Sequence, residues 1–172
     1  MELAEKIESA LVAYLRAQIQ AALDALTLPA YFDPATQIQP SESDAEITSQ
    51  LLRCICPDAD EETPQFTSNF NFTPIVELVT PAELQTDADA ASGDVTESTS
   101  QLDKHRALAA LLETAIMVDD LPASLNAAAL ALGTGYEMTV FGILDHKPQR
   151  SQDKGLYTSG YTFRLYACGR TL

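Results

Sequence analysis

Apolar residues recur at helical spacing over the first 28 residues of the chain. Steps of three and four place eight of them on one stripe: Leu3, Ile7, Leu11, Tyr14, Leu15, Ala22, Leu23 and Leu26. Glu2 and Glu5 stand near the start, where negative charge suits the helix dipole, and Pro29 ends the pattern. The spacing predicts one long amphipathic helix over residues 1–28.

Two shorter apolar runs predict a pair of strands in the next part of the chain. Residues 29–49 hold three prolines and show no clear period, so we expect a loop there, with room for a short helical turn. The runs 51–56 and 72–79 are typical of strands, and Pro74 marks an edge or a bulge in the second one. The acidic residues 58–62 lie between the two runs and favour a hairpin tip.

Helical signals return after residue 100. Ser100 is followed three residues later by Asp103, a variant of the capping box. The buried stripe of this second helix is Leu108, Leu111, Leu112, Ala115 and Ile116. Pro122 is placed to open a short alanine-rich helix, and Gly133 to close it.

The C-terminal part carries two further runs rich in β-forming residues, 136–144 and 161–168. The residues between them, 145–160, are polar and basic and contain glycine, which favours a long hairpin loop. The complete pattern predicts an α+β fold in a single domain, 1–172. We expect a mixed, mainly antiparallel sheet of about four strands, flanked by the long N-terminal helix and the second helix, with extended hairpin loops.

Charge is strongly negative and unevenly placed. Ten basic residues against 25 acidic residues give a net charge of −15, which repels phosphates and argues against tight nucleic-acid binding. Residues 42–62 hold seven acidic residues and one base, Arg53. The last 26 residues hold five of the ten bases and one acid, Asp153.

Signals for membranes and secretion are weak. No stretch approaches the roughly 18 apolar residues that a membrane span needs, and the N-terminus lacks the basic start of a signal peptide. We therefore expect no membrane contact and folding in the cytosol. The three cysteines are an odd number, which argues against a disulfide framework.

Candidate chemistry reduces to a few isolated residues. Cys54 and Cys56 share a face of a strand, so we interpret them as core residues, because a zinc site needs about four ligands. Asp145 and His146 are neighbours in a strand and point to opposite faces. His105 lies between a lysine and an arginine, which favours a solvated position. We expect no enzyme activity, no metal and no cofactor.

Three stretches together resemble the tail terminator proteins of long-tailed bacteriophages. They are the N-terminal amphipathic helix, the segment from His105-Arg106 through Asp119-Asp120-Leu121-Pro122, and the closing pattern of Gly142-Ile143 followed by Tyr161-Thr162-Phe163. The resemblance implies a ring, typically a hexamer, that caps the tail tube. Its partners would be tail tube protein and neck or connector proteins, in a virion assembled in the host cytoplasm.

A ring of this kind suggests where subunits meet. The acidic segment 42–62 would suit the basic segment 147–170 of a neighbour, and further acidity along the bore would let DNA pass without specific binding. The loops 58–66, 84–100 and 145–160 are the expected contact regions. The residues expected at subunit or partner contacts are Glu61, Glu62, Phe66, Phe70, Arg150 and Lys154.

Two alternatives stay open at this point. One is another neck component, such as a head–tail stopper or connector, which would share the ring. The other is an α+β domain that binds a small ligand or acts as an enzyme, and it would need a concave site with convergent polar groups. Oligomeric state separates the second alternative from the ring.

Overall fold

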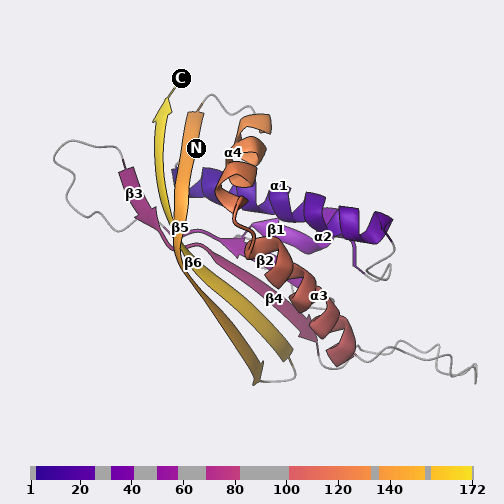
Figure 1. The fold of residues 1–172 in the computed structure, drawn as a ribbon. Coiled ribbons are helices and arrows are strands. Elements are labelled where there is room, and N and C mark those ends of the chain that lie inside the picture. The colour runs from indigo at the N-terminus through magenta and orange to yellow at the C-terminus, as the bar shows by residue number, and fades with distance from the viewer. Residues whose placement is uncertain are drawn as a thin grey trace, which may run out of the picture.

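The chain folds into one mixed sheet with helices on one of its faces (Figure 1). The computed structural model describes residues 3–25, 32–40, 50–57, 69–81, 101–132, 136–153 and 156–171. The helices are α1 (Leu3–Asp24), α2 (Pro34–Gln37), α3 (Gln101–Ile116) and α4 (Leu121–Ala131). The strands are β1 (Ile38–Pro40), β2 (Leu51–Ile55), β3 (Asn69–Phe72), β4 (Ile75–Pro81), β5 (Tyr136–Asp153) and β6 (Leu156–Thr171).

Strand β6 organises the sheet. The strand order is β1-β2-β4-β6, with β3 also paired to β6 and β5 paired along its other side. Only β1 and β2 run parallel among the described strands, and every other pair is antiparallel. Because β3 and β4 pair with successive parts of β6, the sheet ends at β1 on one edge and at β5 on the other. The expected α+β class with a mixed, mainly antiparallel sheet is confirmed.

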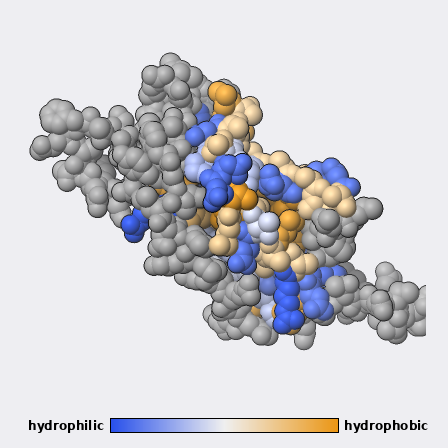
Figure 2. Space-filling view, in the orientation of Figure 1, coloured by the Kyte–Doolittle hydropathy of each residue, from blue (hydrophilic) through white to orange (hydrophobic). Residues whose placement is uncertain are grey.

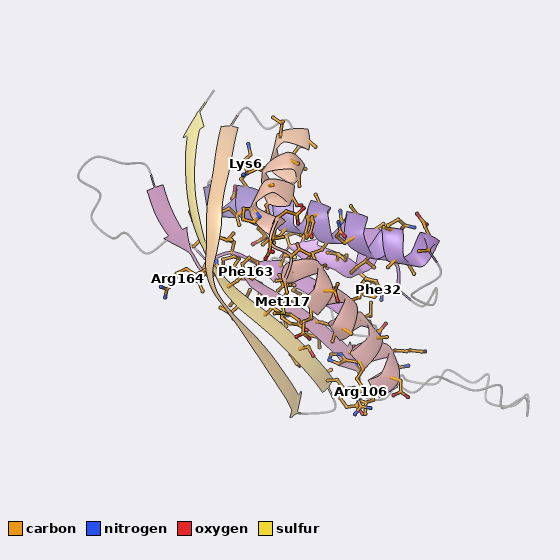
Figure 3. All side chains as sticks on the ribbon, viewed as in Figure 1. Lys6, Phe32, Arg106, Met117, Phe163 and Arg164 are labelled. Atoms are coloured by element: carbon orange, nitrogen blue, oxygen red, sulfur yellow. The ribbon has the colours of Figure 1, made fainter. Side chains whose placement is uncertain are left out.

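The core lies between the helices and the facing side of the sheet. Alternate strand residues point toward the helices, among them Leu52 and Cys54 in β2 and Val76 and Leu78 in β4, each at most 1% exposed. Figure 3 shows Phe163 of β6 on this side and Arg164 on the opposite side. The helical partners at most 2% exposed include Ile7, Leu11, Leu15, Leu108 and Leu112. Each such side chain contributes about 1.5–3 kcal/mol by leaving water.

The predicted helices agree with the observed ones. Helix α1 carries the expected stripe, and its predicted end, residues 26–28, lies outside the described residues. Helix α3 begins at Gln101, one residue after the predicted cap, and α4 occupies Leu121–Ala131. The expected pairing of the two N-terminal strands is also confirmed, since β2 and β4 are antiparallel with Leu51 opposite Val79.

Two loop predictions were wrong in part. The short helical turn allowed within 29–49 is present as α2, and the long C-terminal hairpin is present as β5 and β6, but both segments contain strand that was not predicted. Within 29–49, α2 and β1 form, and the Asp33 carboxylate accepts a bond from the Thr36 hydroxyl (2.7 Å) and one from the Ala35 N–H (3.0 Å). These two bonds hold the pKa of Asp33 below its usual value. The segment 145–160 is mostly strand, because β5 continues to Asp153 and β6 resumes at Leu156. The polar residues of this segment are therefore part of the paired strands β5 and β6.

Two buried tyrosines, one from α1 and one from β6, donate hydrogen bonds to α3. The Tyr14 hydroxyl of α1 donates to the carbonyl oxygen of Ala115 at 2.7 Å. This carbonyl lies in the last turn of α3 and has no partner within the helix. The Tyr161 hydroxyl of β6 donates to the carbonyl oxygen of Ala109 at 3.0 Å. Burial, with the charge of Asp120 adding to it, raises the pKa of Tyr14.

We expect Tyr14→Phe to lower the free energy of unfolding by about 1 kcal/mol at pH 7, because the Ala115 carbonyl loses its partner. A raised pKa means that the unfolded chain ionises first, so this contribution is complete below about pH 10 and is lost at higher pH. Urea denaturation at pH 7 and pH 10.5 measures the free energy of unfolding and tests both points. Tyr161→Phe, which removes the other hydroxyl that bonds to α3, is the matched variant. Equal stability of wild type and Tyr14→Phe at pH 7 would contradict the role of this bond.

Candidate functional site

Two of the residues expected at contacts lie on strands that pair with β6, and the other four lie outside the described residues. Glu61, Glu62, Phe66 and Lys154 lie outside the described residues. Phe70 of β3 stands opposite Ala167 of β6, and Arg150 of β5 stands opposite Ser159. These two positions on β6 are eight residues apart, or about 27 Å along a strand. The structure therefore does not bring Phe70 and Arg150 together.

Strand β5 forms a long edge of the sheet, and its backbone orientation can be assigned. The N–H of Phe163 donates to the carbonyl oxygen of Pro74 at 3.2 Å, on the side of β6 away from β5. Its partner on β5 is His146, whose N–H and C=O therefore point outward from the sheet. Pairing is regular from Asp145 to Asp153, so Pro148, Arg150 and Gln152 share this orientation. Pro148 fits it, because proline has no N–H to give to β6.

The sheet face away from the helices carries a polar row. Arg53 of β2 stands opposite Gln39 of β1 and Glu77 of β4. The Arg53 Nε and the Gln39 Oε1 atoms are buried, and neither has a hydrogen-bond partner. Arg164 on the same face is exposed. Polar groups thus concentrate on the face opposite the core.

Helix α4 presents an apolar outer surface. The segment 121–132 contains no charged residue. Leu130 is 82% exposed and Leu132 is 40% exposed, and Met117, which follows α3, is 51% exposed. Figure 2 shows apolar colour over α4 that continues across the visible face between patches of hydrophilic side chains. Exposed leucines on an uncharged helix are typical of surfaces that meet other proteins.

A buried polar cluster joins α3 to the sheet. The ring of His105 contacts the Thr80 hydroxyl through Nδ1 and the Ser159 hydroxyl through Nε2, both at 2.8 Å. His105 is 5% exposed, Ser159 2% and Thr80 0%. The ring of Tyr157 lies beside it, with centroids 6.0 Å apart. The expectation that His105 is a solvated surface residue was wrong.

The helical period could have placed His105 correctly. It stands three and seven positions before Leu108 and Leu112, on the same buried stripe. Its neighbours Lys104 and Arg106 point elsewhere, and Arg106 is exposed near the end of α3 in Figure 3.

The chemistry of this cluster favours a structural role. A serine hydroxyl next to a histidine nitrogen is the geometry of a nucleophile and its base. Here the other ring nitrogen faces the neutral Thr80 hydroxyl, not a carboxylate that would stabilise a charged ring. The three side chains are also almost fully buried, which prevents a substrate from reaching Ser159. The three side chains instead satisfy one another while holding α3 on β4 and β6.

Cys54 and Cys56 are both buried, which agrees with their interpretation as core residues. Burial, with Glu8 nearby, raises the pKa of the Cys54 thiol. The Glu8 carboxylate accepts a bond from the Cys56 N–H at 3.1 Å. Among the described residues, no group of three or more His, Cys, Asp or Glu could hold a metal ion.

No protein-family model matches the chain, and a search of curated proteins finds no significant match. In the described ranges, no helix has the length and apolar character needed to cross a bilayer. The surfaces of the sheet and of α4 are therefore the features from which a function can be inferred.

We expect His105→Ala to lower the free energy of unfolding by about 2–4 kcal/mol, because it leaves two buried hydroxyl groups without their partner and opens a cavity. The control is Arg106→Ala, the next residue on the helix. Arg106 contacts Asp103 at 3.6 Å with both side chains exposed, so its loss should change stability by about 0.5 kcal/mol or less. Similar stabilities of the two variants in urea would refute the structural role of His105.

We expect the Cys54 thiol to resist alkylation in the folded protein, because it is buried and its pKa is raised. Iodoacetamide treatment followed by peptide mass spectrometry measures modification at this residue with and without urea. Modification of Cys54 at the same rate under both conditions would show that the strand opens readily.

Proposed function

We propose that this protein is a ring-forming structural subunit of a phage virion that terminates the tail tube and joins it to the neck. The observation that supports the proposal is that β5, an edge strand of the sheet, carries basic residues in a strongly acidic chain. Strand β5 contains Lys147 and Arg150 at one edge. The seven acids of residues 42–62 lie outside the described residues, so the proposal takes their charge from the sequence alone.

A closed ring requires two different contact surfaces on each copy. A head-to-tail ring uses two different surfaces of the same chain, which must lie on different sides of it. Unlike charge on these two surfaces would align the subunits and suppress pairing of like edges. Five of the ten bases fall in residues 147–172, so the C-terminal part of the sequence is basic in a chain with a net charge of −15.

The order of elements supports the tail-terminator assignment within the ring-forming class. A long helix, two main strands, two helices and a C-terminal strand pair follow one another in the order on which the resemblance was based. The ring would be a hexamer that contacts tail tube protein and neck or connector proteins and acts without catalysis. Its net negative charge would let DNA slide through the bore without specific binding.

We expect the native mass of the purified protein to correspond to a closed ring, or to a monomer that becomes a ring when tail tubes are added. Reversal of charge in Arg150→Glu with Lys154→Glu should reduce ring formation, because it puts acidic residues against an acidic neighbour. Light scattering or mass photometry at two salt concentrations measures the effect.

The matched control is Arg106→Glu, which changes an exposed base on α3 and should leave assembly unchanged. A wild-type monomer that ignores tail tubes would contradict the proposed function. Rings that bind purified connectors but not tail tubes would favour a different neck component.

A further inference from the structure

The sheet face on the side away from the helices carries a row of residues that crosses four strands (Figure 1). Residues opposite one another on paired strands share a face, so the pairing register gives the order of the row. It runs from Gln39 of β1 through Arg53 of β2 and Glu77 of β4 to Gly160 of β6. All four residues are partly exposed, so another molecule can reach them. Their neighbours along the strands face the core and are at most 1% exposed, among them Ile38, Cys54, Leu78 and Tyr161.

The middle of this row holds an arginine and a glutamate side by side. Arg53 and Glu77 stand directly opposite each other on β2 and β4, yet no ion pair joins them in the described part of the chain. The Arg53 Nε atom also has no hydrogen-bond partner. A side chain that makes no internal bond loses none when it turns toward a partner. The two charges are therefore available for a contact outside the monomer.

The two ends of the row differ in size. Gln39 has a long side chain at one end, whereas a Cβ atom added to Gly160 at the other end would meet no atom within 4 Å. Gly160 lies inside a strand that is paired on both sides, with β4 and with β5. A glycine at such a position often marks a place where another molecule approaches closely. The row thus pairs a projecting end with an open end.

We propose that this face binds the same face of a second copy, about a two-fold axis that runs parallel to the strands between β2 and β4. Rotation about this axis exchanges β2 with β4 and β1 with β6, because the strand order is β1-β2-β4-β6. Arg53 of each copy then meets Glu77 of the other, and Gln39 of each copy meets the open space at Gly160. A two-fold contact requires this reciprocity, since every residue must meet its own partner twice.

The next row supports a second copy as the partner. Ile55 of β2 stands opposite Ile75 of β4, and both are partly exposed on the same face. The same rotation places Ile55 of one copy on Ile75 of the other. Packed sheets lie about 10 Å apart with their strands aligned, so side chains of the two faces interdigitate. Apolar contact beside the charges would exclude water and strengthen the attraction between them.

The contact is centred on these two rows. Leu51 and Val79, which form the row on the other side, are already buried and would add little. The inference goes beyond the proposed ring and does not depend on it. Head-to-tail contacts close a ring, whereas the two-fold contact pairs single copies or pairs two rings face to face.

The decisive variant is Gly160→Val. Valine suits a strand and would enter open space in the monomer, so the melting temperature should be kept. In the pair it would occupy the space that receives Gln39, and the dissociation constant should rise about tenfold or more. Gly160→Ala adds a single methyl group and should weaken pairing less. Sedimentation velocity over a range of concentrations measures both variants, and Gly160→Val should halve the mass of the wild-type assembly.

A charge exchange tests the centre of the contact. Arg53→Glu places like charges together twice in each pair and should also weaken pairing about tenfold or more. Adding Glu77→Arg to it restores unlike charges at both positions and should restore pairing. The control is Arg106→Glu, which makes the same change of charge on α3, on the helical side of the sheet, and should pair as wild type does.

Three outcomes would overturn this contact. They are a wild-type chain that stays single at every concentration, unchanged pairing in folded Gly160→Val, and failure of the Arg53→Glu, Glu77→Arg double variant to pair although it is folded. The proposed function fails separately. Wild-type pairs that never close into rings when tail tubes are added would refute the ring and leave the two-fold contact intact.

Discussion

The pairing of β6 with three strands at once is the constraint on which the rest of the structure depends. Its first part bonds to β4 and its later part to β3, while β5 follows the other side. The same strand sends Ser159, Tyr161 and Phe163 into the core. A shift of one residue along β6 would turn these side chains to the opposite face. The register of β6 therefore sets the sheet and the position of α3 together.

Polar bonds determine where α3 lies on this sheet. Leucines alone would allow the helix to slide, since apolar contacts have no direction. His105 must meet Thr80 and Ser159 at one position, and the Tyr14 and Tyr161 hydroxyls must meet two α3 carbonyls at others. An unmet buried polar group costs about 1–3 kcal/mol, so shifted arrangements are penalised several times over. Burial of apolar side chains thus stabilises the core, and the buried hydrogen bonds determine the one position that α3 takes on the sheet.

Sequence patterns predicted the long elements and missed those whose character depends on distant partners. The stripe of α1 and the cap and stripe of α3 are local signals, and both helices were predicted. The three-residue β1 is held by its pairing with β2, which no local pattern records. Polar residues at 145–153 suggested a loop because the pairing with β6 was not visible. His105 was misplaced because its charged neighbours outweighed the helical period.

The strong net charge has a consequence for how such an acidic chain could assemble. Copies with a net charge of −15 repel one another over distances comparable to the Debye length, about 30 Å at 0.01 M salt. At 0.1 M salt that length falls to about 10 Å, which weakens the general repulsion before it weakens pairs in direct contact. Assembly of the proposed ring through contacts between unlike charges would therefore be strongest at intermediate salt.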